Sequence, residues 1–389
     1  MSIIGGVDTH GDTHTVAAVD LLGRSLGWAQ FPADRAGYRQ LTRWLSSHGR
    51  VEAVGVEGTG SYGAGLTRYL TGAQLPVVEV NRPDRADRRR RGKSDPVDAE
   101  QAARAVANHT ATATPKTRTG PVEAIRMVHT TRAGAVKART AAVNSFVNLL
   151  RTSPDEVRDP LIHLSRARQL RIARSWRTSC SADPHDAAKQ CLRRHADRIA
   201  HLAGEIAAAD KDLRALTAAT GPQLLARPGV GPETCAQLLI TAGDNPDRIR
   251  TEAAFAALCG TSPVAASSGR HQNRHRLNRG GDRQANRALH MIIITRLGRD
   301  PATRAYIDAR GGTTTPHLMR CLKRSLAREI YHLLTQPTPH TAAGSSAAAP
   351  SPERSRGQHP RPTRPTRPRL TAVSTGTPST AEDTAPGHT

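Results

Sequence analysis

Residues 3–19 read IIGGVDTHGDTHTVAAV, and this stretch decides the fold of the first part of the chain. The apolar run Ile3–Val7 ends at Asp8, Gly11-Asp12 suits a tight turn, and Thr13–Val19 has the composition of a returning strand. Two apolar runs separated by one turn predict an antiparallel hairpin that begins a sheet.

The residues after this hairpin alternate between strand-like and helix-like patterns. Further strands are expected near Ser25–Phe31, Val51–Val56 and Leu75–Val80, and helices over 34–45, over 62–70 and from Pro96. Three antiparallel strands, a helix, and then parallel strands alternating with helices form the ribonuclease-H-like layout. We therefore predict an α/β domain of this class over residues 1–112.

The rest of the chain is predicted to be helical up to a terminal tail. Residues 113–219 form a helical spacer, in which 122–150 and 186–216 carry apolar side chains at steps of three and four. This pattern fits a coiled coil with a dimer contact or an internal helical bundle. Residues 220–335 are predicted to form a compact helical domain. The Pro-rich, aromatic-free stretch 336–389 is expected to be disordered.

The charge of the chain indicates a polyanionic partner. Lys and Arg number 56 against 33 Asp and Glu, giving a net charge of +23, and only six of the basic residues are Lys. A strongly basic, Arg-rich chain is typical of nucleic-acid binding through phosphates. Aromatic residues make up 3%, too few for a protein that binds single strands by stacking.

Composition also bounds the cellular compartment. No apolar run approaches the roughly 18 residues of a membrane helix, and the N-terminus resembles no secretory leader. The five cysteines are scattered, without a Cys-x-x-Cys pair, so neither a disulfide framework nor a zinc knuckle is expected. We expect a cytoplasmic, nucleoid-associated protein without a membrane partner.

Four carboxylates stand where strands end or a helix begins. Asp8 closes the first strand, Glu57 closes the fourth, and Asp95 and Asp98 flank a helix start at a spacing that puts both on one side. Four carboxylates in one site repel each other unless a cation neutralises them, so the arrangement indicates Mg²⁺ or Mn²⁺. Two such ions about 4 Å apart are typical of nucleases and other phosphoryl-transfer enzymes.

Each carboxylate also has an ordinary structural interpretation. Asp95 before a proline and Asp98 in the first turn make a good helix N-terminus, and Asp8 precedes a turn. His10 and His14 lie near Asp8 in the sequence. They could bind the metal, or they could be ordinary polar residues of the kind that strands often carry. The order of the four acids on this layout favours the metal site. The basic run Arg85–Lys93 beside them favours a phosphate-binding track.

A second set of motifs lies in the C-terminal domain. Residues 224–234 read LLARPGVGPET, which predicts a helix-hairpin-helix whose Gly229 and Gly231 let backbone N–H groups approach a phosphate; a plain corner between helices is the alternative. A polar loop follows, with Ser267, Ser268 and Gly269 ahead of three arginines expected to contact nucleic acid: Arg270, Arg274 and Arg276.

Three motifs resemble those of the DEDD transposases of the IS110 insertion-sequence family. They are GVDTH at 6–10, VGVEGTGSY at 54–62 and KSDPVDA at 93–99, and the resemblance extends over 228–331. It implies a catalytic domain similar to the RuvC Holliday-junction resolvases, with Asp8, Glu57, Asp95 and Asp98 as metal ligands. In the C-terminal domain it implies a serine nucleophile, which matches Ser268, with Ser267 as the adjacent contender.

The resemblance implies a DNA transposase or recombinase that exchanges strands through a covalent serine intermediate. It further implies a non-coding bridge RNA as guide and a homo-oligomer, a dimer or tetramer, that assembles composite sites. Two alternatives remain open. One is a metal-only junction resolvase in which Ser268 has no chemical role, and the other is a non-catalytic nucleic-acid-binding protein.

Overall fold

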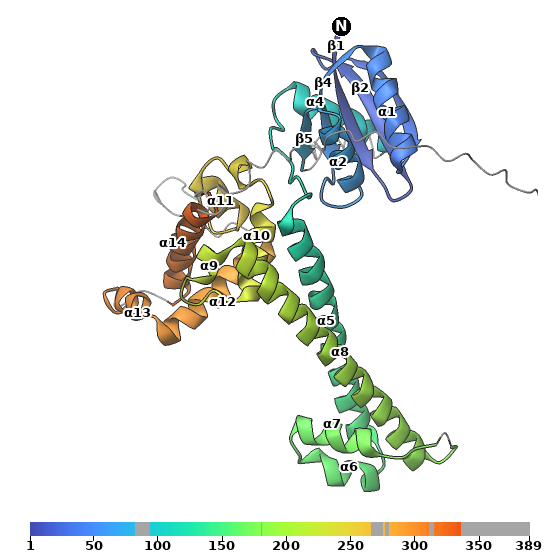
Figure 1. Cartoon of the computed structure of the whole chain (residues 1–389), viewed down its shortest axis with the longest axis vertical. Helices are drawn as coiled ribbons and strands as arrows, with labels where there is room; N and C mark the ends of the chain where they lie inside the picture. The colour runs from blue at the N-terminus through green and yellow to red at the C-terminus, as the bar shows by residue number, and fades with distance from the viewer. Residues whose placement is uncertain (82–93, 180, 266–274, 277–279, 311–314, 336–389) are drawn as a thin grey trace, which may run out of the picture. The chain divides into compact units, whose positions relative to one another are not determined.

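The computed structural model describes residues 1–81, 94–179, 181–265, 275–276, 280–310 and 315–335 (Figure 1). Its first part is a mixed five-stranded sheet in the order β3-β2-β1-β4-β5. The strands are β1 Ser2–Thr9, β2 Thr13–Asp20, β3 Ser25–Pro32, β4 Arg50–Glu57 and β5 Val77–Val80. Strands β1, β2 and β3 pair antiparallel, whereas β4 lies parallel to both β1 and β5. This mixed sheet is consistent with the predicted layout.

Helices cover both faces of the sheet because residues alternate sides along each strand. Ile3, Val7 and Val54 pack with α1 (Arg35–His48) and α2 (Ala64–Gly72), while Ile4 packs with α4 (Asp95–Ala107) on the opposite face. Helix α1 begins where the side chain of Asp34 accepts a hydrogen bond of 2.7 Å from the backbone N–H of Gly37. Sequence reasoning placed these helices within a few residues of their observed bounds.

Two glycines allow α4 to lie directly on the sheet. A Cβ atom at Gly6 would stand 2.2 Å from the backbone nitrogen of Ala103, and one at Gly55 would stand 2.7 Å from the carbonyl oxygen of Ala102. Gly6 and Gly55 are partners in the register of β1 and β4. The missing side chains therefore set how closely the helix approaches the strands.

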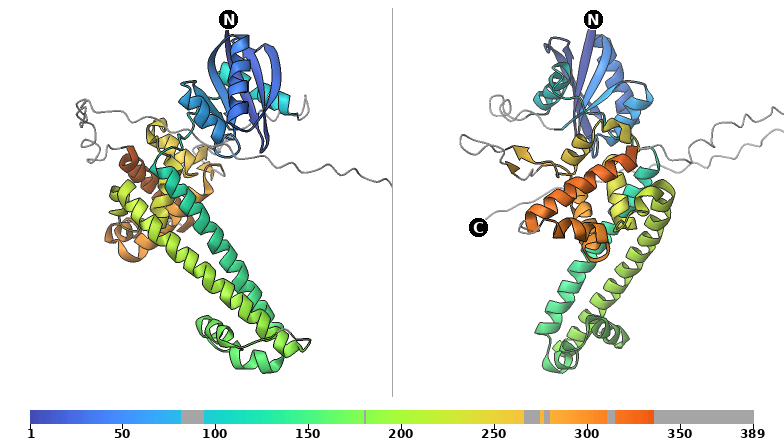
Figure 2. Two further views of the ribbon diagram at one scale, coloured as in Figure 1. Left: turned by 45° about the vertical axis from the view of Figure 1, so that its right-hand side comes forward. Right: turned by 90° about the vertical axis from the view of Figure 1, so that its left-hand side faces the viewer.

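A long antiparallel helical hairpin follows the sheet. Helix α5 (Pro121–Thr152) and helix α8 (Pro184–Thr220) run side by side in each view of Figures 1 and 2, as predicted for the spacer. The shorter helices α6 (Asp155–Ile162) and α7 (Arg166–Ser175) lie between them in sequence and pack at the far end of the hairpin. Helix α6 contains Pro160 within its span.

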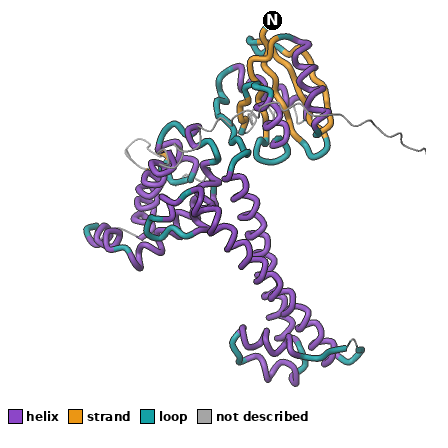
Figure 3. The backbone as a smooth tube through the Cα atoms, viewed as in Figure 1, coloured by secondary structure: helices purple, strands orange, loops and turns teal. Residues whose placement is uncertain are grey.

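The remaining described residues are mostly helical (Figure 3). They form α9 Pro222–Leu225, α10 Pro232–Ala242, the short 3₁₀ helix Pro246–Arg248, α11 Glu252–Leu258, α12 Arg283–Arg299, α13 Pro301–Asp308 and α14 Thr315–Thr335. Their core includes Phe255, Leu289 and Ile330, together with Ile125 of α5 and Leu213 of α8. The base of the hairpin is thus part of this core. Within the described residues, no helix is both long enough and apolar enough to cross a membrane.

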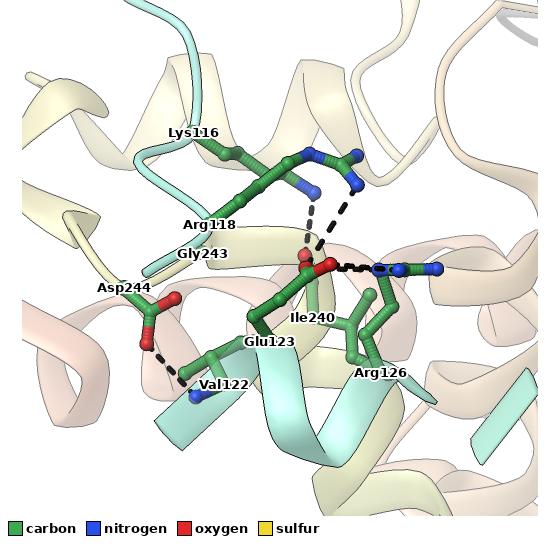
Figure 4. A pocket seen from close by; sticks show the side chains of 8 residues that line it. All are labelled: Lys116, Arg118, Val122, Glu123, Arg126, Ile240, Gly243 and Asp244. Carbon is green, nitrogen blue, oxygen red and sulfur yellow. Dashed lines mark hydrogen bonds and ion pairs between the residues drawn. The ribbon is translucent and has the colours of Figure 1, made fainter. Parts of the chain in front are cut away.

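A polar junction fastens the segment before α5 to the end of α10 (Figure 4). The Lys116 ammonium donates a hydrogen bond to the carbonyl oxygen of Ile240. The Asp244 carboxylate accepts one of 2.8 Å from the backbone N–H of Val122, in the first turn of α5. Asn245 binds the same segment twice, accepting from the N–H of Thr117 and donating to the carbonyl of Pro115. Residues 115–122 are therefore held by side chains more than a hundred positions away.

Candidate metal centre and strand-exchange residues

Asp8 and Glu57 stand at the ends of neighbouring parallel strands, on the face of the sheet that α4 covers. Each lies two residues beyond a glycine that touches α4, Asp8 beyond Gly6 and Glu57 beyond Gly55, so the alternation of a strand places both on that face. The Thr9 hydroxyl donates a hydrogen bond of 2.9 Å to the carbonyl oxygen of Glu57, which ties the two strand ends together.

Asp95 and Asp98 enter from the first turn of α4. Asp98 is buried, with 2% of its surface exposed, whereas the Asp95 side chain is 42% exposed. Pro96 at the start of the helix and the two acids in its first turn favour helix initiation at this point. The predicted capping role and the predicted site role therefore fall on the same residues.

His10 joins two of these carboxylates. Its Nε2 atom lies 3.2 Å from Oδ2 of Asp8 and 3.4 Å from Oδ1 of Asp95. Ligand atoms of these three residues lie within 4.8 Å of one another, close enough to share one metal ion. Sequence reasoning weighed His10 against an ordinary polar position; its place two residues after Asp8, just beyond the strand, was the available signal.

Several like charges surround Asp8. Burial raises the pKa of its carboxyl group, the nearby His10 lowers it, and the charges of Asp95 and Asp98 raise it further. Asp95 and Asp98 therefore lie within electrostatic reach of Asp8. A cation bound among them would relieve this repulsion.

His14, the other histidine in question, lies elsewhere. It is fully buried and its ring stacks on Tyr38 of α1 at a centroid distance of 5.7 Å. Tyr38 packs with the core on the α1 face of the sheet, opposite the face that carries Asp8. Burial also lowers the pKa of the His14 imidazole. His14 is therefore part of the packing of α1 on the sheet.

Two transposase family models match this chain. One, described as a transposase of the DEDD type, covers residues 5–154, and the other, described as the IS116/IS110/IS902 transposase family, covers residues 222–308. The chain belongs to the IS110 family of transposases. A protein of insertion element IS110 from Streptomyces coelicolor is 34% identical over 141 residues. That match spans 33% of this chain and 35% of the relative, so this chain aligns with about a third of the relative's length.

The donor chemistry of this IS110-family chain fits a divalent cation. Asp8 and Asp95 offer carboxylate oxygens, which Mg²⁺ and Mn²⁺ prefer, and His10 offers an imidazole nitrogen, which Mn²⁺ also accepts. The DEDD family model agrees with use of a divalent metal. Glu57 and Asp98 lie outside the three-residue group in this arrangement of side chains, although both approach the same face of the sheet.

The predicted phosphate-binding glycines of the IS110-family chain differ from each other. Gly229 has a positive φ of 77°, and a Cβ atom there would stand 2.8 Å from the carbonyl oxygen of Ile292 in α12, so its packing alone requires glycine. At Gly231 a Cβ atom would meet nothing within 4 Å, and its N–H donates a hydrogen bond to the hydroxyl of Thr234. Gly231 borders open space at the start of α10, where a phosphate contact stays a prediction.

The described residues frame the predicted serine loop at both of its ends. The two-residue strands β6 Val264–Ala265 and β7 His275–Arg276 pair antiparallel, and Arg276 is exposed. Asn286 of α12 donates hydrogen bonds to the carbonyl oxygens of Cys259 and Gly260 just before the loop. Four of the predicted residues lie outside the described part of the chain, as does the basic run 85–93: Ser267, Ser268, Arg270 and Arg274.

Asp282 anchors the far end of this frame. Its carboxylate caps α12 by accepting from the N–H groups of Gln284 and Ala285, and its second oxygen accepts a hydrogen bond of 2.9 Å from the hydroxyl of Thr241 in α10. The Lys323 ammonium donates to the side-chain oxygen of Asn286 at 2.8 Å. Three helices therefore hold the chain where it enters and leaves the segment that carries the two serines.

Proposed function

We propose that this chain is the transposase of an insertion sequence, which cleaves and rejoins DNA with a divalent metal ion and a serine nucleophile. The observation that carries the proposal is the meeting of Asp8, His10 and Asp95 at the end of β1, with Asp98 adding its charge. Family membership supports the activity class. The net charge of +23 supports DNA as the partner.

The residues of the sheet domain have distinct roles in this proposal. Asp8, Glu57, Asp95 and Asp98 hold Mg²⁺ or Mn²⁺. When bound, the ion neutralises charge on the phosphodiester and acts as a Lewis acid toward its oxygens. His10 orients the carboxylates of Asp8 and Asp95, to which its Nε2 atom lies closest. The alternation along β1 and β4 keeps Asp8 and Glu57 on one face for this purpose.

In the C-terminal domain, the proposed nucleophile is Ser268, with Ser267 as the contender. Its Oγ forms a bond to phosphorus and loses its proton, while the bond from phosphorus to one sugar oxygen breaks and that sugar leaves as a free hydroxyl. The phosphoserine ester keeps the phosphodiester bond energy for rejoining to a second strand. Arg270, Arg274 and Arg276 would stabilise the charge on the phosphate.

Removal of one carboxylate tests the metal part. We expect Asp8→Ala, Glu57→Ala and Asp98→Ala each to reduce DNA cleavage by about 100-fold or more, because charge neutralisation at the phosphate is lost. Binding, measured by fluorescence anisotropy in the same buffer, should stay within about twofold, since arginines spread over the chain supply the affinity. Full cleavage by Asp8→Ala with Mg²⁺ present would refute the metal site.

The serine part has an independent test. Wild type should form a protein–DNA adduct that survives denaturation, and the adduct should vanish in Ser268→Ala, or in Ser267→Ala if the neighbouring serine attacks. Ser262→Ala, at a residue ahead of the loop, is the matched control. If the double variant Ser267→Ala/Ser268→Ala still cleaves and joins DNA at the wild-type rate, the metal-only resolvase is the better assignment.

Guidance by RNA and assembly into a dimer or tetramer form the finer part of the proposal, and the sequence resemblance supports both. RNA transcribed from the non-coding DNA beside the gene should co-purify with the protein. It should also redirect cleavage when its pairing segment is changed. Cleavage of an unchanged target after that swap would contradict guidance. Sedimentation with and without this RNA measures the assembly.

A further inference from the structure

We propose that the groove between α7 and the α5–α8 hairpin binds the phosphate backbone of duplex DNA. The inference rests on the proposed function, because DNA is the polyanion on which the chain is proposed to act. The groove lies between α7 and the middle parts of the two long helices. On α5, which begins at Pro121, the lining residue Arg139 lies 18 residues along the helix, about 27 Å from its start.

Side chains from three helices form this groove. Its volume is about 320 Å³. Arg139 of α5 and Arg171 and Arg174 of α7 line it, and all three are exposed. Leu170 and Ile199, with small alanines beside them, form an apolar floor. Guanidinium groups above a floor without carboxylates match an anionic ligand.

Helix α7 carries an unbalanced positive charge. Its sequence, RARQLRIARS over residues 166–175, has four arginines and no acid. Arg174 pairs with Asp197 at 3.0 Å. Among the residues that the structure describes, no carboxylate forms an ion pair with Arg139, Arg168 or Arg171. Arg139 and Arg171 line the same groove, so their charges repel each other in the free protein, and a bound polyanion relieves that repulsion.

The groove is preformed because α7 packs against the hairpin and α6. Ala173 is fully buried in the cluster that also contains Phe146 and Leu192. The buried Gln169 amide donates a hydrogen bond of 2.9 Å to the carbonyl oxygen of Leu161 in α6. A rigid helix loses little entropy when its arginines bind phosphates, and guanidinium groups bind phosphate oxygens in a two-pronged geometry. Duplex DNA presents such phosphates in a regular row.

The test compares Arg139→Gln/Arg171→Gln with Arg214→Gln/Lys211→Gln in the full-length protein. The control pair removes the same charge from exposed positions near the other end of α8. Binding of a 30-base-pair duplex is measured by fluorescence anisotropy across a KCl series without divalent metal. We expect the groove variant to bind about tenfold more weakly at low salt. Its salt slope should be shallower by about two, one unit for each phosphate that an arginine no longer neutralises, and the control should stay within twofold.

Two further measurements keep the proposal falsifiable. Arg139→Lys/Arg171→Lys should keep the salt slope, because the charge remains, and its retention also shows that the helix is intact. A groove variant that loses no more affinity than the control would overturn the proposal. So would a loss confined to a structured RNA of equal length. The Asp8→Ala background separates the two hypotheses, because it abolishes cleavage in the proposed function while the groove effect on binding should persist.

Discussion

The acidic end of the sheet and the basic groove beside α7 are both proposed to bind phosphates, but by opposite means. At the sheet, Asp8 and Asp98 are buried, and glycines at 6 and 55 set the distance to α4. At the hairpin, Arg139, Arg171 and Arg174 are exposed and line an open groove. The first region depends on close packing of α4 on the sheet, which leaves no room for a Cβ atom at Gly6. The second depends on the number and sign of charges, so substitutions should affect the two regions differently.

The largest effect is expected where packing sets the geometry. In Gly6→Ala the new Cβ would stand 2.2 Å from backbone atoms of Ala99 and Ala103, so α4 has to move. We expect a loss of about 3 kcal/mol in the free energy of unfolding, measured with urea, and loss of cleavage because Asp95 and Asp98 move with the helix. Gly134→Ala is the control: nothing lies within 4 Å there, and alanine favours the helix.

Undiminished cleavage in Gly6→Ala would break the comparison. It would mean that the carboxylates tolerate displacement of α4 and that charge alone suffices at the sheet, as we propose for the groove beside α7.

A smaller effect is expected at His10, whose imidazole contacts the carboxylates of Asp8 and Asp95. We expect His10→Ala to raise the Mg²⁺ concentration for half-maximal cleavage by about 10-fold to 100-fold, because Asp8 and Asp95 lose the group that orients them. DNA affinity should not change. The control is His201→Ala, on the exposed surface of α8. If the Mg²⁺ concentration for half-maximal cleavage did not change, His10 would have no part in the metal site, which would then consist of the carboxylates alone.

The smallest effect concerns the junction between these regions. The pKa of Lys116 is lowered from 10.5 to about 8, mainly by burial and also by the charges of Arg248 and Arg118, while the charges of Asp282 and Glu79 oppose the shift. Between pH 8 and 10.5 the unfolded chain binds more protons at this residue than the folded chain does. The free energy of unfolding should therefore rise with pH in this window, by roughly 2 kcal/mol from this group.

Lys116→Met should lack this rise. The difference between wild type and variant, from urea denaturation at pH 7.5, 9 and 10, isolates the contribution of Lys116. Lys211→Met, at an exposed position on α8, should follow the wild-type curve. If the curve for Lys116→Met also parallels that of the wild type, Lys116 titrates in the folded protein as it does in the unfolded chain.

Much of the sheet domain could be predicted from sequence because its signals are local. The turn at Gly11-Asp12 and the cap at Asp34 each depend on a few neighbouring residues, and the order of strands follows from them. The position of His10 between two carboxylates could not be predicted. It depends on where α4 approaches β1, a distance set by Gly6 and by Ala103 almost a hundred residues later.

The α7 groove escaped sequence reasoning for a related reason. Arg139 of α5 and Arg171 of α7 are more than thirty positions apart in the sequence, and in a chain this rich in arginine no single one stands out. Only the folding of α6 and α7 back against the hairpin brings them together. The two helices of the spacer were predictable from their periodicity, but the concave surface they create was not.

The α5–α8 hairpin has a consequence for how such proteins can be lengthened. Hydrophobic clusters close it at both ends, around Ile125 and Leu213 at one and Phe146 and Leu192 at the other, while small alanines such as Ala135 and Ala209 fill the span between them. Seven residues added to each helix in that span would complete two turns and return every side chain to nearly the same face. The hairpin can therefore grow by about 10 Å for each such insertion, while both end clusters keep their contacts. The length of the hairpin can therefore change in fixed steps through paired insertions, without any change in the residues at either end.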